Sequence, residues 1–230
     1  MYSNQQNFAK AIKWTGDLRS RYLHTLAAFR IYERFRKLTA PNIVGKRKAE
    51  VNAKLFSNHV YFFVPLQEAA RCYFFLELAK FFDENKRKQS LTLELLLDLL
   101  ENNFSSFSKD EFLKYHTGRN IIPELLEGYK ALTRQDIKKI RRRLHRNKKL
   151  IVDLKIYRDK HLVHDDTNRN DVKITGLQIR TLLKIIQDTI DMFYLKLDFS
   201  SNIYSNYDKE PVFAVDGVVN ALQEHETDRL

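Results

Sequence analysis

The amino-acid sequence predicts an all-α fold, an up-and-down helical bundle with four to five main helices. The chain of 230 residues holds only 6 Gly and 4 Pro, about a third of their usual share, so turns are few and elements are long. Hydrophobic residues make up 43%, with 16 Phe and 11 Tyr among them, enough for a core that needs no disulfides. Apolar side chains recur at helical intervals, and no strand pattern or internal repeat stands out.

Two long helical elements are expected in the first third of the chain. Residues 4–38 keep apolar side chains at roughly helical spacing, which predicts one helix. Pro41 ends it, because a proline pushes the preceding residue out of the α-helical region. A second element is expected over residues 46–83, and Pro65 within it predicts a kink or a split.

Shorter helices are expected next, and each has a capping signal. Ser90 is the expected N-cap of a helix over residues 91–103. Ser108 and Glu111 have the spacing of a capping box, in which two side chains satisfy the free N–H groups at a helix start. This pair predicts a short helix that Gly118 ends.

The last third of the chain is expected to contain two more long helices. Thr133 and Asp136 resemble a further cap and begin an expected helix over residues 134–161. Thr175 and Gln178 form another capping box, and the helix behind them presents one broad apolar face.

Residues 1–197 are therefore expected to form one helical-bundle domain. The rest of the chain, residues 198–230, is rich in Ser and Asn at first and then acidic. This acidic C-terminal tail also holds enough apolar side chains to form a short helix that docks on the domain or on a partner, with Asp216 as its cap. The alternative is a frayed terminus.

The charge balance favours a polyanionic partner. The sequence has 40 Lys and Arg against 29 Asp and Glu, a net charge of +11, and such an excess attracts polyanions. Cys72 is the single cysteine, which excludes an intrachain disulfide and any multi-cysteine metal site. The first ten residues carry no apolar signal segment, and residues 60–66, the most apolar stretch, are too few to span a membrane. We therefore expect a soluble, cytoplasmic protein with no membrane partner.

The most basic segment lies within the expected helix over residues 134–161. Nine of the sixteen residues from 134 to 149 are Lys or Arg, against one acid, Asp136. Apolar residues at three- and four-residue intervals form a stripe that faces a core, and the basic residues fan around the rest. They provide a track for nucleic-acid phosphates, and the expected contacts are Lys138, Lys139, Arg141, Arg142, Arg143 and Arg146. The alternative is a solvated basic face without a specific role.

The apolar stripe of this helix continues through Ile151 and Leu154 to Arg158 and His161. A guanidinium on an apolar face is costly to bury unless it is paired. Arg158 therefore belongs either to a structural ion pair or to a cleft, such as one between subunits. A histidine exchanges protons near neutral pH, and an arginine keeps its charge. Together they suit phosphodiester cleavage, because one group moves protons while the other stabilises charge on the phosphate oxygens.

The sequence around Arg158 resembles a motif of the HEPN superfamily. Arg158, the polar Asp159 and then His164 match the pattern Arg-polar-x4–6-His, near the end of a long late helix with one helix after it. Residues 157–165, Tyr-Arg-Asp-Lys-His-Leu-Val-His-Asp, look like AbiU-type abortive-infection members of that superfamily. So do residues 78–83, Leu-Ala-Lys-Phe-Phe-Asp, with the Ser-Leu-Thr-Leu that follows them.

The resemblance implies a four- to five-helix bundle that dimerises, so that the motifs of two chains meet in one cleft. Many members are metal-independent ribonucleases that act as toxins or antiviral effectors, so we expect RNA as the substrate, a homodimer, and neither metal nor cofactor. Arg158 would stabilise the phosphorane, His164 would be the acid and base, and Asp159 would orient one of them. The RNA 2′-hydroxyl would attack and leave a 2′,3′-cyclic phosphate.

Spacing along the helix places a condition on this site. Arg158 and His164 are six residues apart, about 600° around an ideal helix, so they do not share a face. Either the helix ends or deforms between them, or the site is completed across the dimer. His161, three residues after Arg158, does share its face and is the expected supporting residue.

One residue departs from the family pattern. Some HEPN toxins carry a Tyr two residues beyond the motif histidine, which a partner nucleotidyltransferase modifies, and this chain has Asp166 there. This departure argues against that mode of antitoxin control. An antitoxin or another protein stays open as a partner.

Two other functions remain open. The first is a non-catalytic helical dimer that binds RNA or a protein partner through its basic helix, with Arg158 in a structural role, because some HEPN domains bind without cleaving. The second is a metal-dependent phosphohydrolase of the HD type, since His164 and Asp165 form a His-Asp doublet. Such a site needs further ligands that converge on a metal, for which His59 and His116 are candidates.

Overall fold

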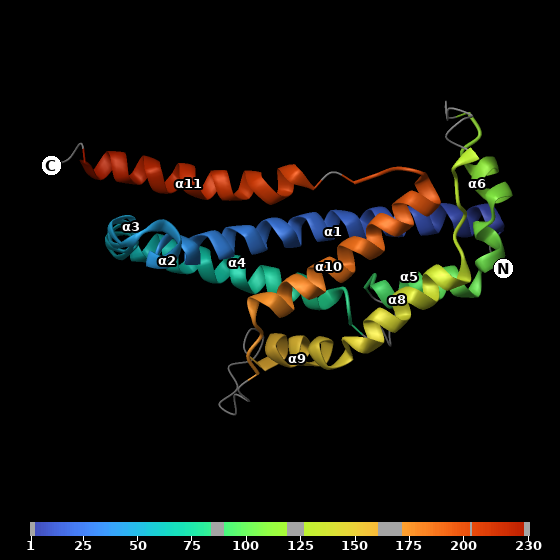
Figure 1. The fold of residues 1–230 in the computed structure, drawn as a ribbon, viewed down its shortest axis with the longest axis horizontal. Coiled ribbons are helices and arrows are strands. Elements are labelled where there is room, and N and C mark those ends of the chain that lie inside the picture. Colours follow the sequence, from blue (N-terminus) through green and yellow to red (C-terminus); the bar gives the residue numbers. More distant parts are fainter. Residues whose placement is uncertain (1–2, 84–89, 119–126, 161–171, 203, 228–230) are drawn as a thin grey trace. The chain divides into compact units, whose positions relative to one another are not determined.

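The computed structural model of the chain describes residues 3–83, 90–118, 127–160, 172–202 and 204–227. Within these ranges every regular element is a helix and none is a strand (Figure 1), so the predicted all-α class is confirmed. Among the same residues, no helix combines the length and the apolar character that a membrane span needs.

The described elements carry the labels of Figure 1. In chain order they are α1 (Asn4–Leu38), α2 (Pro41–Val44), α3 (Lys46–Asn58), α4 (Val60–Lys80), α5 (Leu93–Asn102), the 3₁₀-helix η1 (Phe104–Phe107), α6 (Lys109–Tyr115), α8 (Arg134–Arg146), α9 (Lys148–Arg158), α10 (Gly176–Phe193), the π-helix η3 (Tyr194–Asp198) and α11 (Ser205–Thr227).

Several helix boundaries agree with the sequence. The helix predicted over residues 4–38 is confirmed as α1. The capping box at the start of α8 is also confirmed: the Thr133 hydroxyl accepts from the Asp136 N–H at 3.1 Å, and the Asp136 carboxylate accepts from the Thr133 N–H at 2.9 Å. Thr175 and Gln178 make the same reciprocal pair at the start of α10. Each box satisfies two N–H groups that a helix start leaves free.

The start of α5 differs from the prediction. Thr92 is its N-cap, in place of Ser90, and the Thr92 hydroxyl accepts from the N–H of Leu95 at 3.2 Å. Both residues have a hydroxyl that suits a cap. The tertiary structure selects between them, because the N–H of Leu93 donates to the carbonyl of Phe81 at 3.0 Å and holds the chain at that point.

Two long elements are divided in the structure, the first at another residue than the predicted Pro65 and the second where no division was predicted. The split between α3 and α4 lies at His59, whereas Pro65 lies inside α4. The helix predicted over residues 134–161 is broken at Asn147, which separates α8 from α9. The Asn147 side-chain amide donates to the carbonyl of Arg143 at 2.8 Å, and an asparagine that competes for backbone groups in this way ends a helix.

The chain divides into two compact units, and the first consists of Met1–Tyr22 with Leu78–Asn202. In this unit α8 packs against α5 and α10. Its fully buried side chains come from several helices and include Phe8, Leu96, Leu100, Phe112, Leu154, Leu182, Ile186 and Phe193. Both the basic helix and the motif arginine belong to this unit.

The second unit consists of Leu23–Glu77 with Ile203–Leu230. Its core is formed by Phe35, Leu38, Leu55, Phe63, Val215 and Val219. The Nε and Nη2 atoms of Arg34 donate to the two carboxylate oxygens of Asp216 at 2.6 and 2.9 Å. Asp216 therefore lies within α11 and pairs with α1, and the prediction that it caps a helix is wrong because α11 begins at Ser205.

Candidate functional site

The motif arginine is the last residue of α9. Leu154, one turn earlier on the same helix, is fully buried, and the Arg158 side chain is only 19% exposed. An arginine keeps its charge in a protein, so a guanidinium that is this far buried requires carboxylate partners. The structure provides two.

The first partner of Arg158 is Asp83, which follows α4. The Nη1 atom of Arg158 donates to both carboxylate oxygens of Asp83, at 2.7 and 2.8 Å. The second partner is the neighbouring Asp159, whose Oδ1 accepts from the Arg158 Nε at 2.7 Å. The two carboxylates hold different nitrogens of one planar group, so together they set its orientation as well as its charge.

The electrostatics of this cluster favour the charged guanidinium. Burial alone would lower the pKa of Arg158, but the hydrogen bonds and negative charges of Asp159 and Asp83 outweigh burial and raise it. Arg158 therefore carries a fixed positive charge in a fixed plane, the form that stabilises charge developing on phosphate oxygens.

Asp83 is the site residue that sequence reasoning missed. It ends the segment of residues 78–83, which carries the second part of the AbiU-type resemblance. The structure joins that segment to the motif through the pair of Asp83 with Arg158. The signal was therefore present in the sequence, but neither periodicity nor charge indicates which of several aspartates meets the arginine.

The predicted catalytic His164 and the supporting His161 lie outside the residues that the structure describes, as do Asp165 and Asp166. The structure does define the chain up to them. The α-helix ends at Arg158, and the next two residues, Asp159 and Lys160, have π-helical geometry in place of α-helical geometry.

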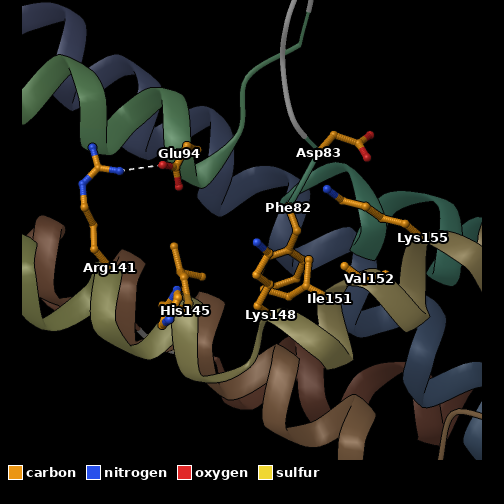
Figure 2. Close-up of a pocket in the computed structure, with 10 residues that line it drawn as sticks. Phe82, Asp83, Glu94, Arg141, His145, Lys148, Ile151, Val152 and Lys155 are labelled. Atoms are coloured by element: carbon orange, nitrogen blue, oxygen red, sulfur yellow. Dashed lines mark hydrogen bonds and ion pairs between the residues drawn. The ribbon is translucent and has the colours of Figure 1, made fainter.

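Two of the predicted nucleic-acid-binding residues on α8 face neighbouring helices. Arg141 donates to Glu94, Asp98 and Glu101 of α5, at 2.6, 2.7 and 2.9 Å, and Figure 2 shows the first of these pairs. Arg143 donates to Asp188 of α10 at 2.6 Å. Both arginines thus connect helices within the first unit, and a phosphate would have to compete with carboxylates for them.

The other four predicted contacts lie on the outer surface of α8. Ile137 and Ile140 are buried on the opposite side of the helix. Successive residues of an α-helix are about 100° apart around its axis, so the four remaining side chains occupy an arc of roughly 100°. This arc lies on the side of α8 opposite the two isoleucines. All four are exposed: Lys138, Lys139, Arg142 and Arg146. This outer face of α8 is a continuous positive surface without a carboxylate of its own.

The sequence of this chain matches a known protein family. A family model described as AbiU2, one of the HEPN families, matches residues 8–216, which is most of the chain. This chain belongs to the AbiU2 family of HEPN domains. No curated protein matches it, and neither does any solved structure.

The AbiU2 match makes this an abortive-infection domain of HEPN type, with an all-α fold consistent with a HEPN-like bundle. It includes Asp83, Arg158 and His164. It also extends to residue 216, within α11, whose Asp216 pairs with Arg34 of α1.

The histidines proposed for a metal site have other partners in this AbiU2 chain. The Nε2 atom of His116, which is buried, lies 2.9 Å from the carbonyl of Leu197. His59 pairs with Glu226 at 3.1 Å. Within the described ranges, no group of three or more His, Cys, Asp or Glu side chains has the arrangement to hold a metal ion.

Proposed function

We propose that this AbiU2-family domain is a metal-independent endoribonuclease that acts as a toxin or antiviral effector in abortive infection. The observation that carries the proposal is the state of Arg158: a partly buried guanidinium at the end of α9, oriented by Asp83 and Asp159. An arginine held in this way costs no reorganisation when charge develops on a phosphate.

The proposed reaction is an attack within the RNA strand itself. The 2′-oxygen of one nucleotide forms a bond to the adjacent phosphorus, and the bond from phosphorus to the 5′-oxygen of the next nucleotide breaks. His164 transfers protons, from the attacking 2′-hydroxyl and to the leaving 5′-oxygen, and Arg158 stabilises the phosphorane between the two steps. The products carry a 2′,3′-cyclic phosphate and a 5′-hydroxyl, and DNA is resistant because it lacks the attacking group.

The proposed assembly is a homodimer in which the motifs of two chains share one cleft. A dimer provides two His164 side chains, so one can remove a proton while the other supplies one. The outer face of α8 binds the flanking phosphates of the same RNA, because its four exposed cations are positioned for a polyanion. Light scattering on the full chain tests this assembly, and a monomer at tens of micromolar would exclude the shared cleft.

The experiment that tests the activity is digestion of RNA by the full chain in EDTA. Wild-type protein is expected to shorten the RNA, and His164→Ala is expected to lower the rate about 10²- to 10⁴-fold, the usual cost of losing a general acid and base. His24→Ala is the matched control, because His24 is exposed on α1 and outside the site. Equal rates for the two variants would contradict the role of His164, and RNA left intact by wild type would contradict the nuclease.

One observation favours a second function, a non-catalytic RNA-binding dimer. The Nε and Nη1 atoms of Arg158 already bond carboxylates, which is also what a structural ion pair requires. A pure binder retains intact RNA indefinitely and releases it as salt rises. The same digestion distinguishes the two functions, because only the enzyme shortens the RNA.

A further inference from the structure

The first unit contains a groove beside the Arg158 ion pair, with a volume of about 450 Å³. Figure 2 shows its lining, which comes from the segment after α4 and from α5, α8 and α9. This volume lies in the range of small-molecule sites, about 300–1,000 Å³. We call it the α9 groove, because α9 contributes more of its lining residues than any other helix.

Apolar side chains form the floor of the α9 groove. Phe82 follows α4, Leu144 belongs to α8, and Ile151 and Val152 belong to α9. Val152 is 42% exposed although it is apolar. An apolar surface of this kind, left open between charged walls, suits a flat ring such as an unpaired base.

The carboxylates that line the groove are engaged by arginines. Glu94 accepts from Arg141 at 2.6 Å, and Asp83 accepts from Arg158 at 2.7 Å. Lys148 adds a positive charge on the α9 wall. The groove therefore combines an apolar floor with a cationic wall, the combination that recognises a base together with its phosphate.

The side of α9 that lines the groove leads directly to the motif arginine. Four residues of α9 follow one another at intervals of four, three and three positions: Lys148, Val152, Lys155 and Arg158. This spacing places them on one side of the helix. Asp83 completes the connection, because it lines the groove and also holds Arg158. If an RNA strand lies along α9, one of its nucleotides contacts Arg158 and the neighbouring nucleotide enters the groove.

We infer that the α9 groove binds one unpaired nucleotide of a single-stranded RNA, next to the phosphate that Arg158 contacts. The base lies on the floor formed by Phe82, Ile151 and Val152, and Lys148 contacts a phosphate of the same strand. This inference rests on the proposal that RNA is the substrate, and it adds that the substrate is single-stranded at this position, because a base that is paired and stacked in an A-form helix does not present its face to a protein surface.

A binding experiment tests the groove separately from cleavage. The probe is a short, fluorescently labelled single-stranded 2′-O-methyl oligonucleotide, which cannot be cleaved by attack of a 2′-hydroxyl. Val152→Asp in the full chain places a negative charge on the floor and is expected to weaken binding by about tenfold or more, the scale of one lost base contact. Leu177→Asp is the matched control, because Leu177 is 75% exposed on α10 and does not line the groove.

A second variant tests the cationic wall. Lys148→Gln is expected to lower the slope of log affinity against log salt by about 0.7, the value for one single-strand phosphate contact. Lys109→Gln, an exposed lysine at the start of α6, is expected to leave the slope unchanged. Circular dichroism and the thermal unfolding midpoint show whether each variant is folded. A second substitution at the floor, Val152→Lys, is expected to preserve the binding that Val152→Asp loses.

The outcomes separate the groove from the activity. Weaker binding by Val152→Asp and a lower salt slope for Lys148→Gln support the nucleotide site even if wild type never cleaves RNA, in which case only the endoribonuclease proposal fails. Wild-type affinity in Val152→Asp overturns the inference even if cleavage is observed. Unchanged RNA binding together with a lost protein partner in the same variants overturns it in favour of a protein-docking groove.

Discussion

The Arg158 guanidinium donates through Nη1 to both carboxylate oxygens of Asp83, at 2.7 and 2.8 Å, and so joins the end of α9 to the segment that follows α4. The two residues are 75 positions apart in the sequence. Both lie in segments that carry the AbiU-type resemblance, residues 78–83 and 157–165. The ion pair gives a physical reason for the two segments to occur together.

Replacing Asp83 with Asn should lower the free energy of unfolding. The variant keeps the shape of the side chain but removes the charge that balances Arg158, and hydrogen bonds to charged groups contribute about 1.5–3 kcal/mol. We expect a loss near the lower end of this range, because the Asp83 side chain is 28% exposed and solvent screens its attraction to Arg158. Urea unfolding measures the change, with Glu50→Gln on the exposed surface of α3 as the control. Equal losses in the two variants would show that the ion pair adds nothing.

Arg141 and Arg142 should behave differently although they are adjacent. Arg141→Gln leaves Glu94, Asp98 and Glu101 without their shared cation, and carboxylates at this spacing on α5 repel one another. A loss of about 1–2 kcal/mol in unfolding free energy is expected for Arg141→Gln, and less than about 0.5 kcal/mol for the outward-facing Arg142→Gln. Thermal and urea unfolding of the two variants give the comparison, which fails if Arg142→Gln is the more destabilised.

The outer face of α8 should account for much of the salt dependence of RNA binding. Replacing Lys138, Arg142 and Arg146 together with Gln should weaken binding to unrelated RNAs alike. The slope of log affinity against log salt should fall by up to about 0.7 for each lost contact. The control replaces three exposed cations of α3, residues 46–48, and removes the same charge. An identical slope in both triple variants would mean that only net charge matters.

The capping box of α8 should weaken in acid. Burial alone would raise the pKa of Asp136, but its hydrogen bonds from the Thr133 hydroxyl and N–H outweigh burial and lower it. The folded chain therefore takes up this proton less readily than the unfolded chain. The stabilisation is complete above the ordinary carboxyl pKa and is lost as pH falls through the lowered value.

Asp136→Asn isolates this contribution. The variant should cost about 1 kcal/mol at neutral pH, as other cap losses do, and the difference from wild type should shrink as pH falls below the ordinary carboxyl pKa, where the lowered pKa of Asp136 lies. Thermal unfolding at several pH values measures it. A difference that stays constant over this range would show that the carboxylate charge is irrelevant to the cap.

Local chemistry made much of the fold predictable from sequence. The helical spacing of apolar residues gives the bounds of α1, and the Thr133 and Thr175 boxes give the starts of α8 and α10. The errors arise where tertiary contacts decide. Leu93 bonds Phe81 and moves the start of α5 to Thr92, and the buried stripe through residues 137–154 concealed the break at Asn147.

The site was predictable only in part, for a related reason. The sequence identifies Arg158 through its motif and states that it needs a partner, but it does not identify Asp83 as that partner. Likewise it treats the cations of α8 as equivalent, although Arg141 and Arg143 pair with α5 and α10 while Arg142 and Arg146 are exposed. Which charges meet is a property of packing between helices, and composition does not encode it.

The most direct test of the central claim is the mass of the RNA fragments that the full chain produces in EDTA. Wild-type protein is expected to leave fragments with a 2′,3′-cyclic phosphate at one end and a 5′-hydroxyl at the other. Arg158→Lys should produce them about 10²- to 10³-fold more slowly, because an ammonium cannot reproduce the forked donors that Asp83 and Asp159 hold. Intact RNA, fragments that end in a 3′-hydroxyl, or equal rates for wild type and Arg158→Lys would contradict the account.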